Sequence, residues 1–255
     1  MSYSAPRVQV FEDAQSLADA AAGEFVRLAR ENVARSGRFT VALSGGSTPK
    51  RLYRTLAGED YRSRVAWGRV HFFWGDERDV PADHPDSNFG AARDLLLAPL
   101  DIPSDNVHPM MGGSGDAAEA ATEYEEELRR IFGLVGKRSL PRFDLVLLGL
   151  GADGHTASLF PGSGALTEDE RLVMATWVER LHSFRITLTC PVFNHAACIL
   201  FLVAGAEKAE TLRDVLERPA EPSRIPAQLI RPSAGELSWY VDRAAASLLS
   251  NLNRR

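Results

Sequence analysis

Cysteine is scarce in this chain of 255 residues, which contains only two, Cys190 and Cys198. They form no CxxC pair and no spacing typical of a zinc site. Both lie in apolar, strand-like sequence, where a free cysteine behaves as a small buried hydrophobic residue. The sequence therefore argues against a disulfide framework and favours a reducing compartment, so we expect a cytoplasmic protein.

Long hydrophobic runs are also missing. The longest, such as residues 198–204, are far shorter than the roughly 20 residues of a membrane span. Residues 1–14 contain no apolar stretch of the kind found in a secretory signal. The net charge of −5 lacks the basic excess typical of a nucleic-acid-binding domain. We therefore expect neither a membrane nor a nucleic-acid partner, although a local cluster of cations and N–H groups can still bind a small anion.

Motifs of several enzyme classes are absent as well. No HExxH motif and no pair of histidines at metal-binding spacing occurs, so we expect no catalytic metal. A GxxxxGK[ST] loop, which would imply a nucleotide, is absent. A GxSxG elbow, which would indicate a covalent serine intermediate, is absent as well. The sequence predicts a protein that needs no cofactor.

Strand-like and helix-like segments alternate along the chain. We expect strands at 8–11, 39–43, 69–74, 143–149, 184–190 and 198–204, and helices at 13–36, 49–56, 87–97, 117–132 and 207–217, before residues 244–253 close the chain. This alternation predicts an α/β fold with a mainly parallel sheet. No loop is long enough for a domain linker, so we expect residues 1–255 to form one domain. Ligands of such sheets bind beyond the carboxyl ends of the strands, so we expect the functional residues to follow the strands.

A glycine-rich turn follows the strand at 39–43. It consists of Ser44, Gly45, Gly46, Ser47, Thr48 and Pro49. Thr48 is expected to cap the next helix, with Pro49 in its first turn. The glycines allow close approach of a ligand, and a helix N-terminus attracts anions. The turn therefore predicts a phosphate site, with an ordinary capped strand-to-helix turn as the alternative.

A charged segment follows the strand at 69–74. Its residues Asp76 and Glu77 are expected to accept hydrogen bonds from sugar hydroxyls, and Arg78 to bind a phosphate or carboxylate. Asn88 follows closely enough to line the same rim. The alternative is a solvated loop, which four consecutive charges usually indicate.

A second glycine-rich segment, residues 149–160, follows the apolar strand at 143–149. It spells GxGxxG through Gly149, Gly151 and Gly154, but no strand ending in a ribose-binding acid follows it. Asp153 beside His155 in such a loop is typical of a general base and its partner. Backbone N–H groups of the loop are candidate oxyanion donors. The alternative is a helix-capping aspartate and a structural histidine.

Two further cations lie near expected strand ends, Arg185 and Lys208. Both are candidates to face the ligand end of the sheet, and each alone is more often a surface charge. Four further histidines form no recognisable constellation, and we expect them to be structural or exposed. They are His71, His108, His182 and His195.

Taken together, these segments resemble the family of 6-phosphogluconolactonases and glucosamine-6-phosphate isomerases. The resemblance runs in order from about residue 8 to residue 245. It is carried by Leu43–Pro49, Trp74–Arg78, Gly149–Pro161, Arg185–Thr189, Asn194, Phe201–Gly205, Lys208, Ala209, Pro226, Ala227 and Trp239. It implies a Rossmann-like α/β/α sandwich. The segment 179–183 departs from the family pattern, because it lacks an expected Pro and Lys.

The resemblance also implies an activity. Deaminases of this family carry a catalytic Glu where this chain has Phe160, so the lactonase activity is favoured. We expect a monomer that hydrolyses 6-phospho-D-glucono-1,5-lactone in the oxidative pentose phosphate pathway, with His155 as general base and Asp153 orienting it. The alternatives are an isomerase or deaminase of an amino sugar phosphate and a non-catalytic sugar-phosphate sensor.

Overall fold

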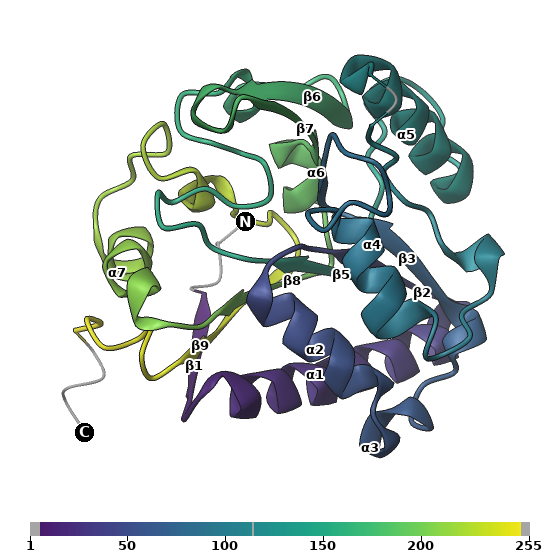
Figure 1. Ribbon diagram of the computed structural model, residues 1–255, viewed down its shortest axis with the longest axis horizontal. Coiled ribbons are helices and arrows are strands. Elements are labelled where there is room, and N and C mark those ends of the chain that lie inside the picture. Colours follow the sequence, from purple (N-terminus) through teal and green to yellow (C-terminus); the bar gives the residue numbers. More distant parts are fainter. Residues whose placement is uncertain (1–5, 114, 251–255) are drawn as a thin grey trace.

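The computed structural model describes residues 6–113 and 115–250. Six strands form a wholly parallel sheet in the order β1-β9-β8-β5-β2-β3 (Figure 1). They are β1 (Arg7–Phe11), β2 (Phe39–Leu43), β3 (Val70–Trp74), β5 (Leu145–Leu148), β8 (Cys198–Val203) and β9 (Glu236–Asp242). The predicted α/β class with a mainly parallel sheet is confirmed.

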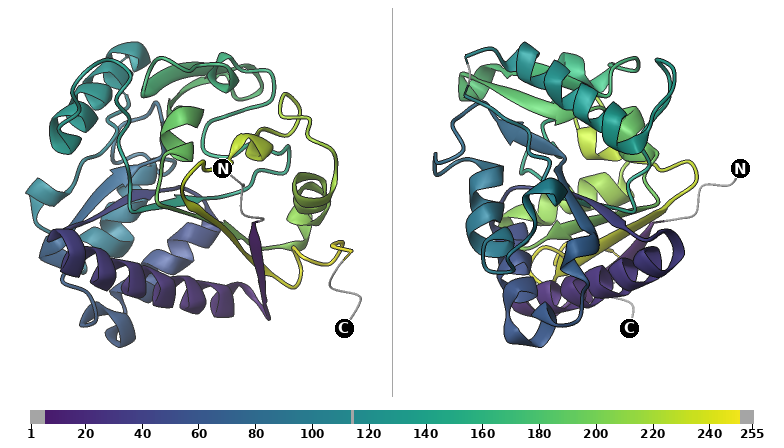
Figure 2. Two further views of the ribbon diagram at one scale, coloured as in Figure 1. Left: turned by 180° about the vertical axis from the view of Figure 1, so that it is seen from behind. Right: turned by 90° about the vertical axis from the view of Figure 1, so that its right-hand side faces the viewer.

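Helices flank this sheet. They are α1 (Ala14–Ser36), α2 (Ser47–Ala57), α3 (Glu59–Arg62), α4 (Asn88–Ala92), α5 (Ala117–Phe132), α6 (Cys190–Asn194) and α7 (Ala209–Glu217). Figures 1 and 2 show α1 and α2 along one face and α5 and α6 on the other. The long helix α1 begins where Asp13 accepts hydrogen bonds from two backbone N–H groups and ends at Gly37, which has a φ of 78°.

A second, antiparallel sheet was not predicted. It contains β4 (Asp76–Arg78), β7 (Ser183–Leu188) and β6 (Val173–Val178), in the order β4-β7-β6. The strand expected at 184–190 exists as β7, but it belongs to this antiparallel sheet and not to the parallel one. The expected helix at 87–97 is α4 followed by a π-helical turn, Arg93–Leu97. β4 depends on pairing with β7, which is distant in sequence, and local patterns do not reveal that pairing.

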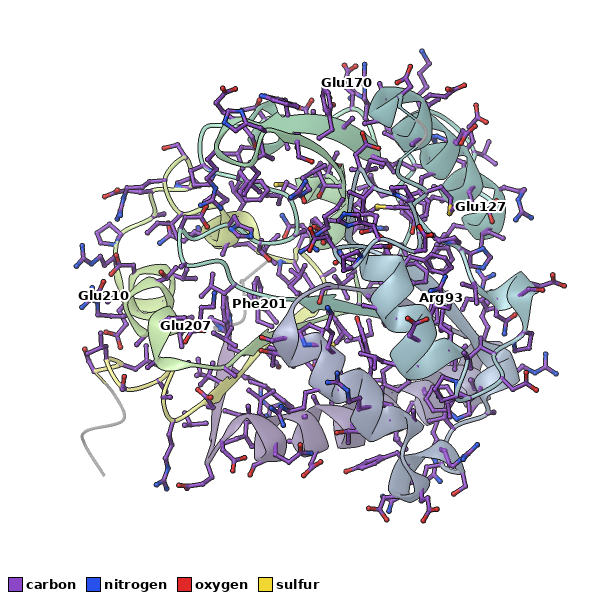
Figure 3. The ribbon with its side chains drawn as sticks, in the orientation of Figure 1. Arg93, Glu127, Glu170, Phe201, Glu207 and Glu210 are labelled. Carbon is purple, nitrogen blue, oxygen red and sulfur yellow. The ribbon has the colours of Figure 1, made fainter. Side chains whose placement is uncertain are left out.

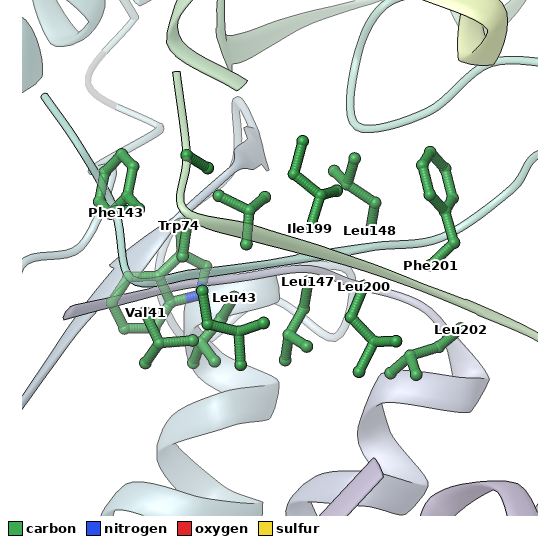
Figure 4. Close-up of a cluster of buried hydrophobic side chains, with 14 of the residues drawn as sticks. Val41, Leu43, Trp74, Phe143, Leu147, Leu148, Ile199, Leu200, Phe201 and Leu202 are labelled. Carbon is green, nitrogen blue, oxygen red and sulfur yellow. The ribbon is translucent and has the colours of Figure 1, made fainter. Parts of the chain in front are cut away.

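The core lies on both faces of the parallel sheet. Figure 4 shows Leu147 and Leu200 on one side, and Leu148, Ile199 and Phe201 on the other. All five are buried, and alternation along each strand sends neighbours to opposite faces. Continuous apolar strands such as β5 and β8 are expected where helices cover both faces of a sheet.

Several glutamates lie toward the outer edge of the molecule. Figure 3 labels Glu127, Glu170 and Glu210 there and Phe201 near the middle of the view. Within residues 6–113 and 115–250, no helix is long and apolar enough to cross a membrane. Because all six strands of the main sheet are parallel, the segments that follow β2, β3, β5 and β8 emerge at one edge of it.

Candidate active site

A cleft opens at this carboxyl edge of the parallel sheet. Its walls come from the turns after β2, β5 and β8 and from β4. The cleft brings together most of the predicted site residues: Ser44, Gly45, Gly46, Ser47, Thr48, Asp76, Arg78, Asn88, Gly151, His155 and Lys208. Leu150, Ala157, Leu202 and Val203 supply an apolar part of the wall. Four of the predicted residues, Glu77, Asp153, Gly154 and Arg185, do not line it.

One wall of the cleft is the turn that opens α2. The N-cap of α2 is Gly46, with a φ of 105°, so the prediction that Thr48 caps the helix is wrong. Ser47 and Thr48 instead occupy its first turn, and among the described residues their N–H groups donate to no acceptor. The Ser44 hydroxyl is buried, also without a partner there. Free donors at the positive end of a helix dipole are suited to an anion.

Asn88 packs closely against this turn. A side chain on Gly45 would overlap the Asn88 amide, so only glycine fits there. Asn88 Nδ2 donates to the Asp76 carbonyl over 2.9 Å, and the Asn88 side chain reaches the cleft from the start of α4. The amide therefore links the glycine-rich turn to β4.

The two carboxylates of β4 have different roles. Asp76 lines the cleft, and the Ser158 hydroxyl donates to its Oδ2 over 2.7 Å. Glu77 is 1% exposed and accepts from the backbone N–H groups of Asn88 and Phe89, each over 2.7 Å. Burial raises the pKa of Glu77, although these bonds oppose the rise. The expectation that Glu77 contacts substrate is therefore wrong: it anchors the start of α4.

The three candidate cations are also separated. Arg78 and Lys208 line the cleft, Lys208 from the 3₁₀ turn Ala206–Lys208 after β8. Arg185 lies opposite Arg78 in the β4–β7 pairing, but its guanidinium donates to Ser183 Oγ and the Phe184 carbonyl, over 2.8 and 2.9 Å. Burial and the nearby Arg78 charge lower the pKa of Arg185. Two cations, rather than three, therefore face the anion turn.

His155 also lines the cleft, in the loop after β5. Its Nδ1 contacts Asp153 Oδ1, and its Nε2 has no partner among the described residues. Its ring stacks on Phe160, with centroids 4.3 Å apart. Burial alone would raise the pKa of Asp153, but hydrogen bonds and charge from His155, with the charge of Arg180, lower it to about 2. Asp153 is thus an ionised acceptor for Nδ1–H, which leaves Nε2 free to take a proton.

The glycines of this loop shape it rather than supply donors. Gly151 N donates to the His155 carbonyl over 2.8 Å, and Gly154 N to the Gly151 carbonyl over 3.0 Å. These two N–H groups are occupied and are not available to an oxyanion; the prediction for the other N–H groups of the loop stays a prediction. Gly154 has a φ of 82° and packs against Ile225, which gives it a structural role instead of substrate contact.

Neighbouring elements tie down the same loop. Thr211 Oγ1 on α7 donates to the Ala152 carbonyl over 2.7 Å, and Ala227 N donates to the Gly154 carbonyl over 2.9 Å. Arg180 is 2.6 Å from Asp153 Oδ2. Sequence reasoning missed Arg180, because it reaches the site from a segment with no motif of its own. It also missed Ser158, which lies within the glycine-rich segment 149–160 but contacts Asp76 only through the fold.

The other histidines lie outside the cleft. His71 Nδ1 and His108 Nε2 are 3.2 Å apart, and His108 Nδ1 is 2.9 Å from Glu127. This pair was not predicted as a cluster, but its position between β3 and α5 agrees with a structural role. No group of three or more His, Cys, Asp or Glu side chains suited to a metal occurs in the part of the chain that the structure describes.

Comparisons with known proteins agree with this geometry. A family model described as glucosamine-6-phosphate isomerases/6-phosphogluconolactonase matches residues 12–239. A 6-phosphogluconolactonase of Synechocystis sp. is 44% identical over 96% of this chain and 99% of its own length. One of Haemophilus influenzae is 37% identical over 94% of this chain and 98% of its own.

Solved structures give the same assignment. A 6-phosphogluconolactonase from Trypanosoma brucei superposes with a TM-score of 0.87 at 33% identity, covering 98% of this chain and all (100%) of that one. A monomeric glucosamine-6-phosphate deaminase, with a TM-score of 0.79 at 20% identity, covers 95% of this chain and 99% of its own and shares the fold. The chain belongs to the glucosamine-6-phosphate isomerase/6-phosphogluconolactonase family.

Proposed function

We propose that this chain hydrolyses 6-phospho-D-glucono-1,5-lactone to 6-phosphogluconate, with His155 as general base. One observation carries the proposal: the free Nε2 of His155 shares a cleft with the anion-binding turn of α2. Relatives named 6-phosphogluconolactonase at 37–44% identity support the same activity. We further propose that the enzyme acts as a monomer in the cytoplasm.

The phosphate binds at the start of α2. The free N–H groups of Ser47 and Thr48 donate to it, and the cations Arg78 and Lys208 close around it. The Ser44 hydroxyl, buried without a partner among the described residues, supplies a further donor. Anchoring the phosphate there fixes the distance of the lactone carbonyl carbon from His155. Asp76 and Asn88, which line the same cleft, accept and donate hydrogen bonds to the sugar hydroxyls.

Hydrolysis proceeds through water activated by His155. Nε2 removes a proton from water as its oxygen bonds to C1, and the carbonyl electrons move to the carbonyl oxygen. The tetrahedral intermediate collapses, the bond from C1 to the ring oxygen breaks, and imidazolium returns the proton to that oxygen. The product acid then ionises, which releases one proton per turnover. Asp153 holds Nδ1–H throughout, so that Nε2 is the basic nitrogen.

The deaminase alternative lacks a catalytic group in this cleft. Phe160, in the position of the deaminase Glu, stacks its ring on His155 and is 6% exposed. An apolar ring there transfers no proton. A non-catalytic sensor would need no ionised Asp153 beside His155, so the dyad favours hydrolysis.

Proton release tests the proposed function directly. Fresh lactone is mixed with the protein in weak buffer containing a pH indicator, and the spontaneous rate is subtracted. The proposal predicts catalysed release of one proton per lactone and no ammonia from glucosamine 6-phosphate. A rate equal to the spontaneous one, or ammonia release, contradicts it.

A further inference from the structure

Arg180 lies at the tip of the hairpin formed by β6 and β7, in the 3₁₀ turn Glu179–Leu181. This tip is the segment in which the chain departs from its family's sequence pattern. Its guanidinium nevertheless reaches the loop after β5, where Nη2 is 2.6 Å from Asp153 Oδ2. The hairpin therefore contacts the loop of Asp153 and His155 through the side chain of Arg180.

Arg180 makes a second contact with the same loop. Its Cζ lies over the Phe160 ring, 5.1 Å from the centroid, and that ring stacks on His155. Asp153 and His155 contact each other directly. The four side chains thus form a closed circuit in which Arg180 holds both the carboxylate and the ring on which the imidazole rests.

The hairpin tip is built to hold this arginine in place. Trp177 Nε1 donates to Glu179 Oε2 over 2.7 Å, and the Trp177 and Phe184 rings pack edge to face with centroids 5.0 Å apart. Both contacts flank the turn that carries Arg180. Its backbone is therefore fixed independently of the ion pair with Asp153.

We propose that Arg180 is a positioning residue of the hydrolysis, which fixes the Asp153 carboxylate so that it presents Oδ1 to His155 Nδ1. The inference rests on the proposed general-base role of His155. Arg180 occupies Oδ2, which leaves Oδ1 as the acceptor for the imidazole. The segment 179–183 thus acts through the catalytic pair and not through substrate.

The contribution of Arg180 to stability is small. The Arg180 side chain is 53% exposed, and exposed ion pairs contribute little to folding. Effects on the fold and on catalysis therefore separate. Arg180→Met removes the charge and keeps much of the apolar stem, whereas Arg180→Lys keeps a cation that reaches Asp153. Arg171→Met is the matched control, an arginine 68% exposed and 4.0 Å from Glu168, remote from the circuit.

The experiment measures kcat and KM of these variants by proton release between pH 5.5 and 8.5. Their thermal stability is measured separately by thermal denaturation. For Arg180→Met we expect kcat about tenfold lower, because a misplaced catalytic group is costly, with KM unchanged. Arg180→Lys should restore most of the lost kcat, and Arg171→Met should match the unmodified protein.

Other results overturn the inference. An unchanged kcat in Arg180→Met excludes the positioning role. So does a loss in kcat that Arg180→Lys leaves unrestored, or a change confined to KM, which would mean direct substrate contact. His155→Asn, assayed in parallel, separates the two proposals. Full activity of His155→Asn would contradict the general-base role of His155. Normal kinetics of Arg180→Met together with an inactive His155→Asn would contradict only the role of Arg180.

Discussion

The backbone of Gly151 lies directly against the imidazole ring of His155, so closely that a methyl group on Gly151 would overlap Nδ1 and Cε1 of the ring. The same methyl group would also approach Asp153 Oδ1. Gly151, the second glycine of the GxGxxG segment, thus packs against the pair formed by Asp153 and His155, where a side chain would displace them.

Gly151→Ala is therefore expected to displace His155. A shift of about 1 Å in a catalytic group costs roughly 100-fold in rate, so kcat should fall by about that factor. Gly164→Ala is the matched control, because its added methyl group meets nothing within 4 Å. Proton release measures both variants, and equal activity of the two would show that the close packing is irrelevant.

Ala157 follows Thr156 and lines the cleft. It adopts a left-handed backbone conformation with a φ of 47°. This conformation costs an L-residue about 1–2 kcal/mol, whereas glycine adopts it freely. Ala157→Gly should raise the free energy of unfolding by about 1 kcal/mol after the entropy of the unfolded glycine is subtracted. Urea denaturation checks this, and a decrease in stability would argue against strain at Ala157.

Glu77→Gln tests the structural role of the buried β4 carboxylate. Glutamine leaves one of the N–H groups at the start of α4 without its charged acceptor, so the free energy of unfolding should fall by about 2 kcal/mol. The exposed Glu126 on α5 gives the control Glu126→Gln, which should have no effect. If Glu77→Gln instead raises KM without lowering stability, Glu77 contacts substrate after all.

The pair His71 and His108 predicts a pH dependence of stability. Burial lowers the pKa of both rings from 6.5; at His71 the charges of His108 and Arg38 add to this, and at His108 Glu127 opposes it. The unfolded chain therefore binds more protons than the folded one, and stability falls as the pH drops below about 6.5. Urea denaturation from pH 7.5 to 5 should show this fall, and the double variant His71→Gln, His108→Gln should reduce it. An equal slope in both proteins would refute the assignment.

Much of the fold could be predicted because its pattern is local. The continuous apolar run of β5 and the glycine that ends α1 each indicate their own structure. β4 could not be predicted in this way, since Asp76, Glu77 and Arg78 form a strand only through pairing with β7.

The site follows the same division. His155 and the turn at Ser47 could be predicted because each follows a buried strand whose carboxyl end faces the ligand. The role of Glu77 could not, because adjacent β4 residues point to opposite sides and the sequence does not say which side is the cleft. Arg180 could not either, since its contact with Asp153 joins two loops by tertiary packing alone.

The most direct test of the central claim is the turnover of His155→Asn, measured by proton release from fresh lactone with the spontaneous rate subtracted. Asparagine keeps a side chain that accepts no proton, so kcat should fall by about 100-fold or more. Affinity for 6-phosphogluconate, measured by calorimetry, should stay close to that of the unmodified protein, because the substitution leaves the proposed phosphate site at the start of α2 unchanged. A kcat within about threefold of the unmodified protein would contradict the assignment of His155 as general base.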